Sequence, residues 1–149
     1  MIDVPKNAYN QVIESGITRG CVIRTLYQFG EEDRKFKYFV SIGNTPSNDP
    51  LFFVITTSKP AFFDKHPQYE QDIVRIPKGV FDFFPEETIL DCKRVFRHTK
   101  DALKESFENK DLKFCGYLTD DYVSKIDEII KKSRHIPLKD KKCIFDRGF

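Results

Sequence analysis

Two short clusters in this 149-residue chain combine positive charge with hydroxyl groups. The first is DRKFK, residues 33–37, with three cations, and the second is TTSK, residues 56–59, with three hydroxyls and one cation. A guanidinium or ammonium group can neutralise charge that develops at phosphorus, and a hydroxyl can hold a non-bridging phosphate oxygen. The clusters therefore fit a site that handles a phosphodiester. Their spacing alone favours a plainer alternative, a charged hairpin rim beside a turn-capping threonine.

The two clusters lie at the ends of two predicted strands. FKYFVSIG, residues 36–43, and LFFVITTS, residues 51–58, are both rich in β-branched and aromatic residues. The turn formers GNTPSNDP separate them. A simple antiparallel hairpin brings the start of the first strand near the end of the second, so we expect Arg34 and Lys35 to face Thr56.

The other segments predict a single α+β domain over residues 1–149, in which helices pack against an antiparallel or mixed sheet. Helix signals follow Thr99 and Thr119, which are both N-cap residue types. The stretch KPAFFDKHPQYEQ, residues 59–71, contains two prolines and predicts a long loop. Further strands are predicted at residues 21–28, within 72–79 and at 88–96, a helix at 5–15 and a short apolar bridge at 114–118.

Composition excludes several kinds of site. Hydrophobic residues make up 40% of the chain and the net charge is only +2, which indicates a buried core and no strong overall field. The sequence has no CxxC pair, Cys/His cluster or glycine-rich phosphate loop, so we expect neither a metal nor a cofactor. The cysteines are far apart and three of them lie within apolar runs, which predicts a reducing, cytoplasmic location. No apolar run reaches about 18 residues, so we expect no contact with a membrane. The histidines, His66, His98 and His135, are expected to be solvated loop residues.

Five segments, in chain order over residues 17 to 134, resemble the PemK/MazF-type toxin family. GITRGCVIRTLYQF resembles the family's opening strand, in which a basic residue and a glycine precede an apolar run. DRKFKYFVSI resembles its Arg-Arg-Pro segment, and FVITTS its strand that ends in Ile-Thr or Thr-Thr. FPEETILDCKRVF resembles the late strand, and CGYLTDDYVSKIDEIIKK the closing Gly-x-Leu with its terminal helix.

The resemblance implies a fold and an activity. Members form a small SH3-like barrel of the PemK/CcdB type, usually as a homodimer paired with an antitoxin protein, and they cut single-stranded RNA without a metal. The 2′-hydroxyl attacks the adjacent phosphorus and leaves a cyclic phosphate. Carried onto this chain, the catalytic residues are Arg34 or Lys35, together with Thr56. The expected substrate-binding neighbours are Thr57, Ser58, Lys59 and Lys37.

The chain departs from the family pattern at several positions. Phe36 stands where the family has proline, and strict register puts Lys35 where the catalytic arginine is expected. An ammonium lacks the planar, two-pronged donor geometry of a guanidinium, which predicts weak or absent activity. The remaining departures are Arg94, Val95 and Phe96 in place of Gln-x-Arg, a helix-like insertion at 99–113, an N-terminal extension at 1–16 and a tail at 135–149.

Two other functions remain open. The first is a non-catalytic binding module on the same barrel, acting on a protein partner such as gyrase or an antitoxin. The loop predicted at residues 59–71, rich in phenylalanine and proline, favours it through Phe62 and Phe63. The second is a structural or accessory domain, for which the sequence offers no positive sign.

Overall fold

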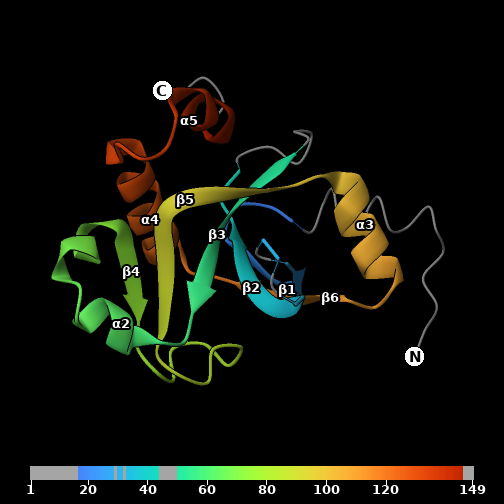
Figure 1. Ribbon diagram of the computed structural model, residues 1–149, viewed down its shortest axis with the longest axis horizontal. Helices are drawn as coiled ribbons and strands as arrows, with labels where there is room; N and C mark the ends of the chain where they lie inside the picture. Colours follow the sequence, from blue (N-terminus) through green and yellow to red (C-terminus); the bar gives the residue numbers. More distant parts are fainter. Residues whose placement is uncertain (1–16, 29, 32, 44–49, 146–149) are drawn as a thin grey trace.

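A computed structural model describes residues 17–28, 30–31, 33–43 and 50–145 (Figure 1). The helix predicted at residues 5–15 and most of the GNTPSNDP turn lie outside these ranges. The described part of the chain is α+β, as predicted, with one antiparallel sheet and apolar cores on both of its faces.

The sheet has six strands in the order β4-β5-β3-β2-β1-β6, and each neighbouring pair is antiparallel. The segment predicted as an apolar bridge is most of β6, which pairs with the outer edge of β1. The strands are β1 (Cys21–Tyr27), β2 (Lys35–Ser41), β3 (Leu51–Thr57), β4 (Ile73–Ile76), β5 (Thr88–His98) and β6 (Leu112–Tyr117).

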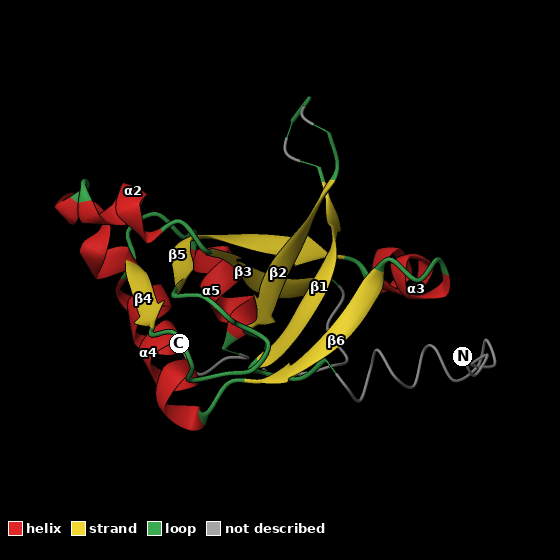
Figure 2. Cartoon of the chain, turned by 90° about the horizontal axis from the view of Figure 1, so that it is seen from below, coloured by secondary structure: helices red, strands yellow, loops and turns green. Residues whose placement is uncertain are grey.

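The closed barrel that we expected is not formed. The edge strands β4 and β6 make no ladder with each other in the described part of the chain, and Figure 2 shows them on opposite sides of the sheet. The helix α4 (Asp120–Lys132) packs against β4 and β5. A closed barrel would require β4 to pair with β6. Instead, β4 is a short edge strand that packs against a helix.

The helices predicted after Thr99 and Thr119 are confirmed as α3 (Lys100–Glu108) and α4. The Thr99 hydroxyl accepts a hydrogen bond of 3.1 Å from the Ala102 amide, whereas the Thr119 side chain makes no capping hydrogen bond. The prediction of a long loop at residues 59–71 is wrong. Most of this segment is helical, in α2 (Pro60–Asp64) and the 3₁₀ helix η1 (Pro67–Asp72). Both begin with proline, whose fixed φ suits the first helical turn.

Side-chain alternation along the strands gives the sheet two buried faces. Val22, Val40 and Val54 lie on one face, in a cluster completed by residues of α4 and α5 (Leu138–Ile144). On the other face, Ile23 and Phe39 belong to a cluster that includes residues of α3 and β6.

The cysteines follow this division. Cys21 and Cys92 are buried in the two clusters, and burial raises the pKa of the Cys21 thiol to about 12. Cys115, which we also expected in an apolar run, is only partly buried. The four cysteines form no disulfide. The burial of Cys21 and Cys92 agrees with the prediction that cysteines within apolar runs act as small apolar side chains, whereas Cys143, for which this was not predicted, is exposed.

A buried lysine joins the last two helices. Lys141 is 8% exposed, and its ammonium donates to the carbonyl oxygens of Lys131 and Ser133 at 2.9 and 2.7 Å. These carbonyls lie at the C-terminal end of α4, where a cation also complements the helix dipole. This contact fixes α5 against α4 in a segment that the sequence predicted to be a charged tail.

Candidate functional site

Five of the seven predicted site residues line one cleft of about 490 Å³, which we name the hydroxyl–lysine cleft. They are Lys37, Thr56, Thr57, Ser58 and Lys59. The opposite wall comes from the segment before β5, so three separate stretches of chain meet here. The other lining residues are Phe36, Tyr38, Phe83, Phe84, Pro85, Glu86 and Thr88.

The pairing of β2 with β3 decides which side chains meet. Phe39 pairs with Ile55, Val40 with Val54 and Ser41 with Phe53. Continued by one and two residues, the same register sets Thr56 opposite position 38 and Thr57 opposite position 37. Lys37, and not Arg34 or Lys35, is therefore the cation of this strand that lines the cleft with the threonines, and it stands opposite Thr57, whereas Thr56 stands opposite Tyr38.

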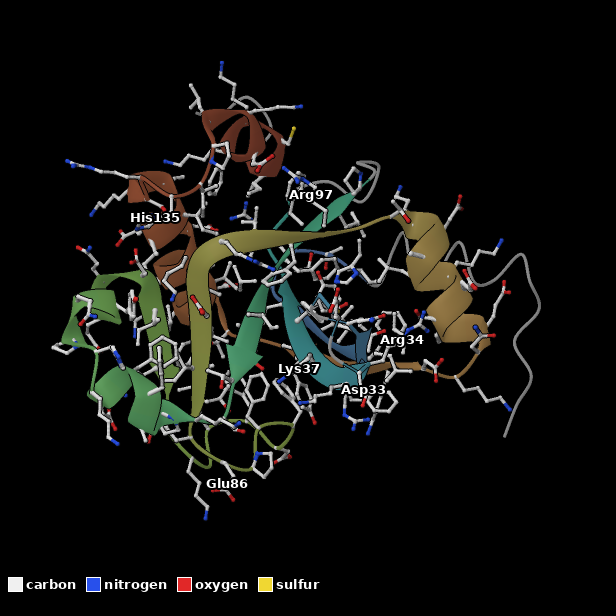
Figure 3. All side chains as sticks on the ribbon, in the orientation of Figure 1. Asp33, Arg34, Lys37, Glu86, Arg97 and His135 are labelled. Carbon is white, nitrogen blue, oxygen red and sulfur yellow. The ribbon has the colours of Figure 1, made fainter. Side chains whose placement is uncertain are left out.

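The expected meeting of Arg34 and Lys35 with Thr56 is absent. Arg34 is four positions from position 38, which corresponds to about 13 Å of extended strand. It lines a different cleft, formed with α3, and Lys35 lines neither of these two clefts. In Figure 3, Arg34 lies towards α3, while Glu86 lies at the far side of the sheet from it, near the segment before β5. The prediction failed because the register of a hairpin with a long connection cannot be read from local sequence.

The hydroxyl groups in the cleft have different environments. The Thr57 hydroxyl accepts a hydrogen bond of 3.3 Å from the Lys59 amide, which is the turn-capping role considered above. The Thr88 hydroxyl donates to the Glu86 carbonyl at 3.0 Å. Thr56 is 6% exposed, and its hydroxyl has no hydrogen-bond partner among the residues that the structure describes. Thr56 is thus the threonine best able to bond a ligand.

An exposed aromatic ring stands at the edge of the same cleft. Phe36 is 42% exposed, and the Arg24 guanidinium lies 4.0 Å from the centre of its ring. Such a ring offers a planar apolar surface beside the cations Lys37 and Lys59. The sequence also offered Phe36, with Phe62 and Phe63, as a ring that could stack on an RNA base, with packing in the core as the alternative, and the ring is exposed.

A glycine supports the far wall. Gly116 has φ of +153°, and a Cβ atom there would lie 2.7 Å from the ring of Phe83. Only glycine lets this ring pack directly on β6, which positions the segment before β5. The signal in the sequence was the aromatic run FDFFPEE, which we had read only as the approach to a strand.

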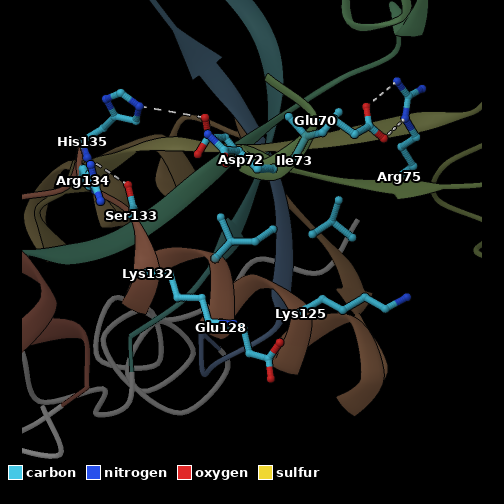
Figure 4. A pocket seen from close by; sticks show the side chains of 13 residues that line it. Glu70, Asp72, Ile73, Arg75, Lys125, Glu128, Lys132, Ser133, Arg134 and His135 are labelled. Atoms are coloured by element: carbon cyan, nitrogen blue, oxygen red, sulfur yellow. Dashed lines mark hydrogen bonds and ion pairs between the residues drawn. The ribbon is translucent and has the colours of Figure 1, made fainter. Parts of the chain in front are cut away.

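A groove of about 830 Å³ lies between η1, β4 and α4 (Figure 4). Its charged groups largely neutralise one another. Arg75 makes two bonds to Glu70, of 2.9 and 3.0 Å, and a third contact of 3.0 Å to Asp64. Hydrogen bonding from Arg75 lowers the pKa of Glu70, and His135 lies 4.0 Å from Asp72. The groove is larger than the hydroxyl–lysine cleft, but Arg75, Glu70, Asp72 and His135 on its lining already contact oppositely charged or hydrogen-bonding partners.

A stack of aromatic rings covers α2 and η1. Phe62 is 49% exposed and stacks on His66 with ring centres 4.3 Å apart, and His66 stacks on Tyr69 at 5.9 Å. Phe63 differs, because it is 5% exposed and packs with the buried Ile73. Of the two phenylalanines proposed for partner binding, only Phe62 is therefore a surface residue.

Among the described residues, no group of histidine, cysteine, aspartate and glutamate side chains is arranged to hold a metal ion. No helix in the same ranges has both the length and the apolar character needed to cross a membrane. No protein-family model matches the chain, and no curated protein matches it. The likeness to PemK/MazF-type toxins therefore rests on the sequence segments quoted above.

Proposed function

We propose that the protein binds single-stranded RNA in the hydroxyl–lysine cleft and cleaves it without a metal. The observation that carries this proposal is the meeting of Lys37, Lys59 and Thr56 with the exposed Phe36 ring in one cleft. Cations and a hydroxyl suit a phosphate group, and an exposed ring suits a stacked base. A phosphodiester and a neighbouring base occur together along every single-stranded nucleic acid.

Each group has a role in the proposed reaction. The Thr56 hydroxyl and the two lysines bind the non-bridging oxygens of the scissile phosphate. Glu86, the one carboxylate among the described lining residues, accepts the proton of the 2′-hydroxyl. The 2′-oxygen bonds to phosphorus as the bond to the 5′-oxygen breaks, and the leaving oxygen takes a proton from water. The products are a 2′,3′-cyclic phosphate and a 5′-hydroxyl end.

This proposal differs in one residue from the role carried over by resemblance. Lys37 replaces Arg34 or Lys35 as the cation that stabilises charge at phosphorus, because it alone of the three lines the cleft with Thr56. A single ammonium binds less firmly than a bidentate guanidinium, so a slow enzyme is expected. A toxin role, an antitoxin partner, homodimerisation and a cytoplasmic location belong to the same proposal through the PemK/MazF-type resemblance.

The test is incubation of the full chain with end-labelled single-stranded RNA of mixed sequence in excess EDTA. We expect slow cleavage that leaves 2′,3′-cyclic phosphate ends. Lys37→Ala with Thr56→Val should abolish cleavage and weaken RNA binding. Lys35→Ala distinguishes the two assignments of the cation. It should leave cleavage unchanged if Lys37 stabilises the charge at phosphorus, and should reduce cleavage if Lys35 does. RNA that is neither bound nor cut by the folded wild-type protein would overturn the proposal.

The aromatic stack on α2 and η1 favours a second candidate, binding of a protein partner. Phe62 exposes 49% of its surface while its ring is held in place by His66 and Tyr69. Fixed exposed aromatic rings are typical anchors of protein interfaces. If the protein is toxic through such a partner, toxicity should persist in the Lys37→Ala, Thr56→Val variant and disappear with Phe62→Ala. Val80→Ala, at an exposed apolar residue outside this stack, is the matched control.

A further inference from the structure

A second polar cleft, of about 280 Å³, lies between α3, the end of β1, the start of β2 and the end of β5. We name it the Thr25–His98 cleft after two residues that line it. It is on the face of the sheet opposite α4, and α3 forms one wall. Arg34, one of the two cations for which the family resemblance implied a catalytic role, lines this cleft.

Two buried polar atoms in this cleft have no partner. Thr25 is 2% exposed, and its hydroxyl oxygen makes no hydrogen bond within the described part of the chain. The same holds for Nε2 of His98. A buried polar atom left unpaired costs about 1–3 kcal/mol, so such atoms are uncommon in folded proteins. Two of them lining one cleft indicate that something bonds there.

The His98 imidazole is held rigidly and without charge. The rings of Tyr27, Phe39 and Phe53 pack edge-on around it, with centres 5.6, 4.8 and 5.1 Å away. Burial lowers the pKa of His98 to about 4, so the ring is neutral at physiological pH. A neutral imidazole has one N–H donor and one acceptor, and a neutral ligand can bond it without desolvating a charge.

The remaining lining groups define the chemistry of that ligand. Arg34, Glu105 and Asp111 all line the cleft, and their combined formal charge is one negative charge. This net charge disfavours binding of a phosphate. A guanidinium pairs well with two adjacent acceptors on a planar ring, such as O6 and N7 of guanine. Carboxylates accept from N–H groups, which guanine carries at N1 and N2 on its neighbouring edge.

The size of the cleft limits the ligand to a small molecule. A water molecule takes up about 30 Å³ of liquid, so one bridging water would leave most of the cleft unfilled. Pockets for drug-sized ligands span roughly 300–1,000 Å³, which puts this cleft at the scale of a single ring system. We propose that the Thr25–His98 cleft binds a guanine base. The base could belong to free guanosine or to a guanine nucleotide within an RNA strand, and this inference does not depend on RNA cleavage.

The experiment is titration of the full chain with guanosine, followed by calorimetry or by NMR. Saturable binding is expected, about 2–10-fold weaker for inosine, which lacks the N2 amino group, and about tenfold or more weaker for adenosine. Thr25→Val keeps the side-chain shape but removes the hydroxyl, so it should weaken guanosine binding about 2–10-fold. Ser124→Ala, at an exposed hydroxyl on α4, is the control and should have no effect.

Each outcome bears on the proposal. It is overturned if folded wild-type protein shows no saturable guanosine binding, or if Thr25→Val and His98→Phe, both confirmed as folded, leave the affinity unchanged. If guanosine binds with the same affinity as an RNA pentamer that contains one guanine, the ligand is a free nucleoside. If that pentamer binds more tightly than both guanosine and the same pentamer with adenine in place of guanine, the ligand is a guanine nucleotide within an RNA strand. The Thr56→Val variant should bind guanosine normally, because Thr56 lies on β3 and lines only the hydroxyl–lysine cleft of these two, which separates this site from the proposed RNA cleft.

Discussion

The hydroxyl–lysine cleft and the Thr25–His98 cleft both contain hydroxyl and cationic side chains, but the two clefts differ in their exposure to solvent. The hydroxyl–lysine cleft sits at strand ends, where Ser58 and Lys59 are exposed to solvent. The Thr25–His98 cleft reaches into a core cluster, where the Thr25 hydroxyl and the His98 ring nitrogen are buried without partners. Removing a polar group should therefore change ligand binding in the first cleft and folding stability as well as binding in the second.

The largest expected difference concerns two phenylalanines of β2. Phe39 is fully buried and packs against Tyr27, Phe53 and His98, so Phe39→Ala should cost about 3–5 kcal/mol of unfolding free energy. Phe36 is 42% exposed, and Phe36→Ala should change the stability by about 0.5 kcal/mol or less. Urea unfolding measures both. Similar losses in the two variants would contradict the contrast between the clefts.

Acid should destabilise the protein through His98. The unfolded chain protonates this ring at its ordinary pKa of 6.5, whereas burial lowers the pKa in the folded protein to about 4. The unfolded state therefore binds more protons between these values, and stability that is complete above pH 6.5 falls as the pH approaches 4. The loss attributable to His98 is about 3 kcal/mol at most.

This loss is measured by urea unfolding above pH 6.5 and near pH 4. His98→Phe should lose distinctly less stability over that interval than the wild-type protein does. His66→Gln, which replaces a histidine stacked at the surface on Phe62, is the matched control. An unchanged pH dependence in His98→Phe would show that His98 is not buried in its neutral form.

Thr25→Val should stabilise the ligand-free protein by about 1 kcal/mol, because valine has a similar shape and removes an unpaired buried hydroxyl. Thermal unfolding of matched samples measures this gain, and saturating guanosine should reduce it by stabilising the wild-type protein more. A loss of stability in Thr25→Val would mean that the hydroxyl is already paired in the folded protein, for example by water.

The smallest stability effect is expected in the hydroxyl–lysine cleft. Lys37 is partly exposed at a strand end, so Lys37→Ala should change the unfolding free energy by about 0.5 kcal/mol or less. Its effect should appear in RNA binding, as a shallower dependence of affinity on salt, because one phosphate contact is lost. Filter binding at several salt concentrations measures this slope. An identical slope for wild type and variant would place the RNA backbone elsewhere.

Several elements could be predicted from local sequence because local physics determines them. The strands β1, β2, β3 and β5 and the helices α3 and α4 follow from apolar periodicity, and the cap at Thr99 follows from its side-chain chemistry. Proline misled the prediction at residues 59–71, since it both interrupts helices and begins them. Strand β6 was missed because its glycine and mixed burial hide the alternation of a strand.

The sequence by itself determined which residue types could handle a phosphate and that hydroxyls end β3. Only the tertiary structure decided which cation joins them, because strand register depends on the packing of Phe39, Val40 and Ser41 against β3. The same applies to His98, which the sequence predicted to be solvated. It is partly buried, with Nε2 fully buried, because three aromatic rings from β1, β2 and β3 converge on the end of β5, and no local sequence pattern indicates that convergence.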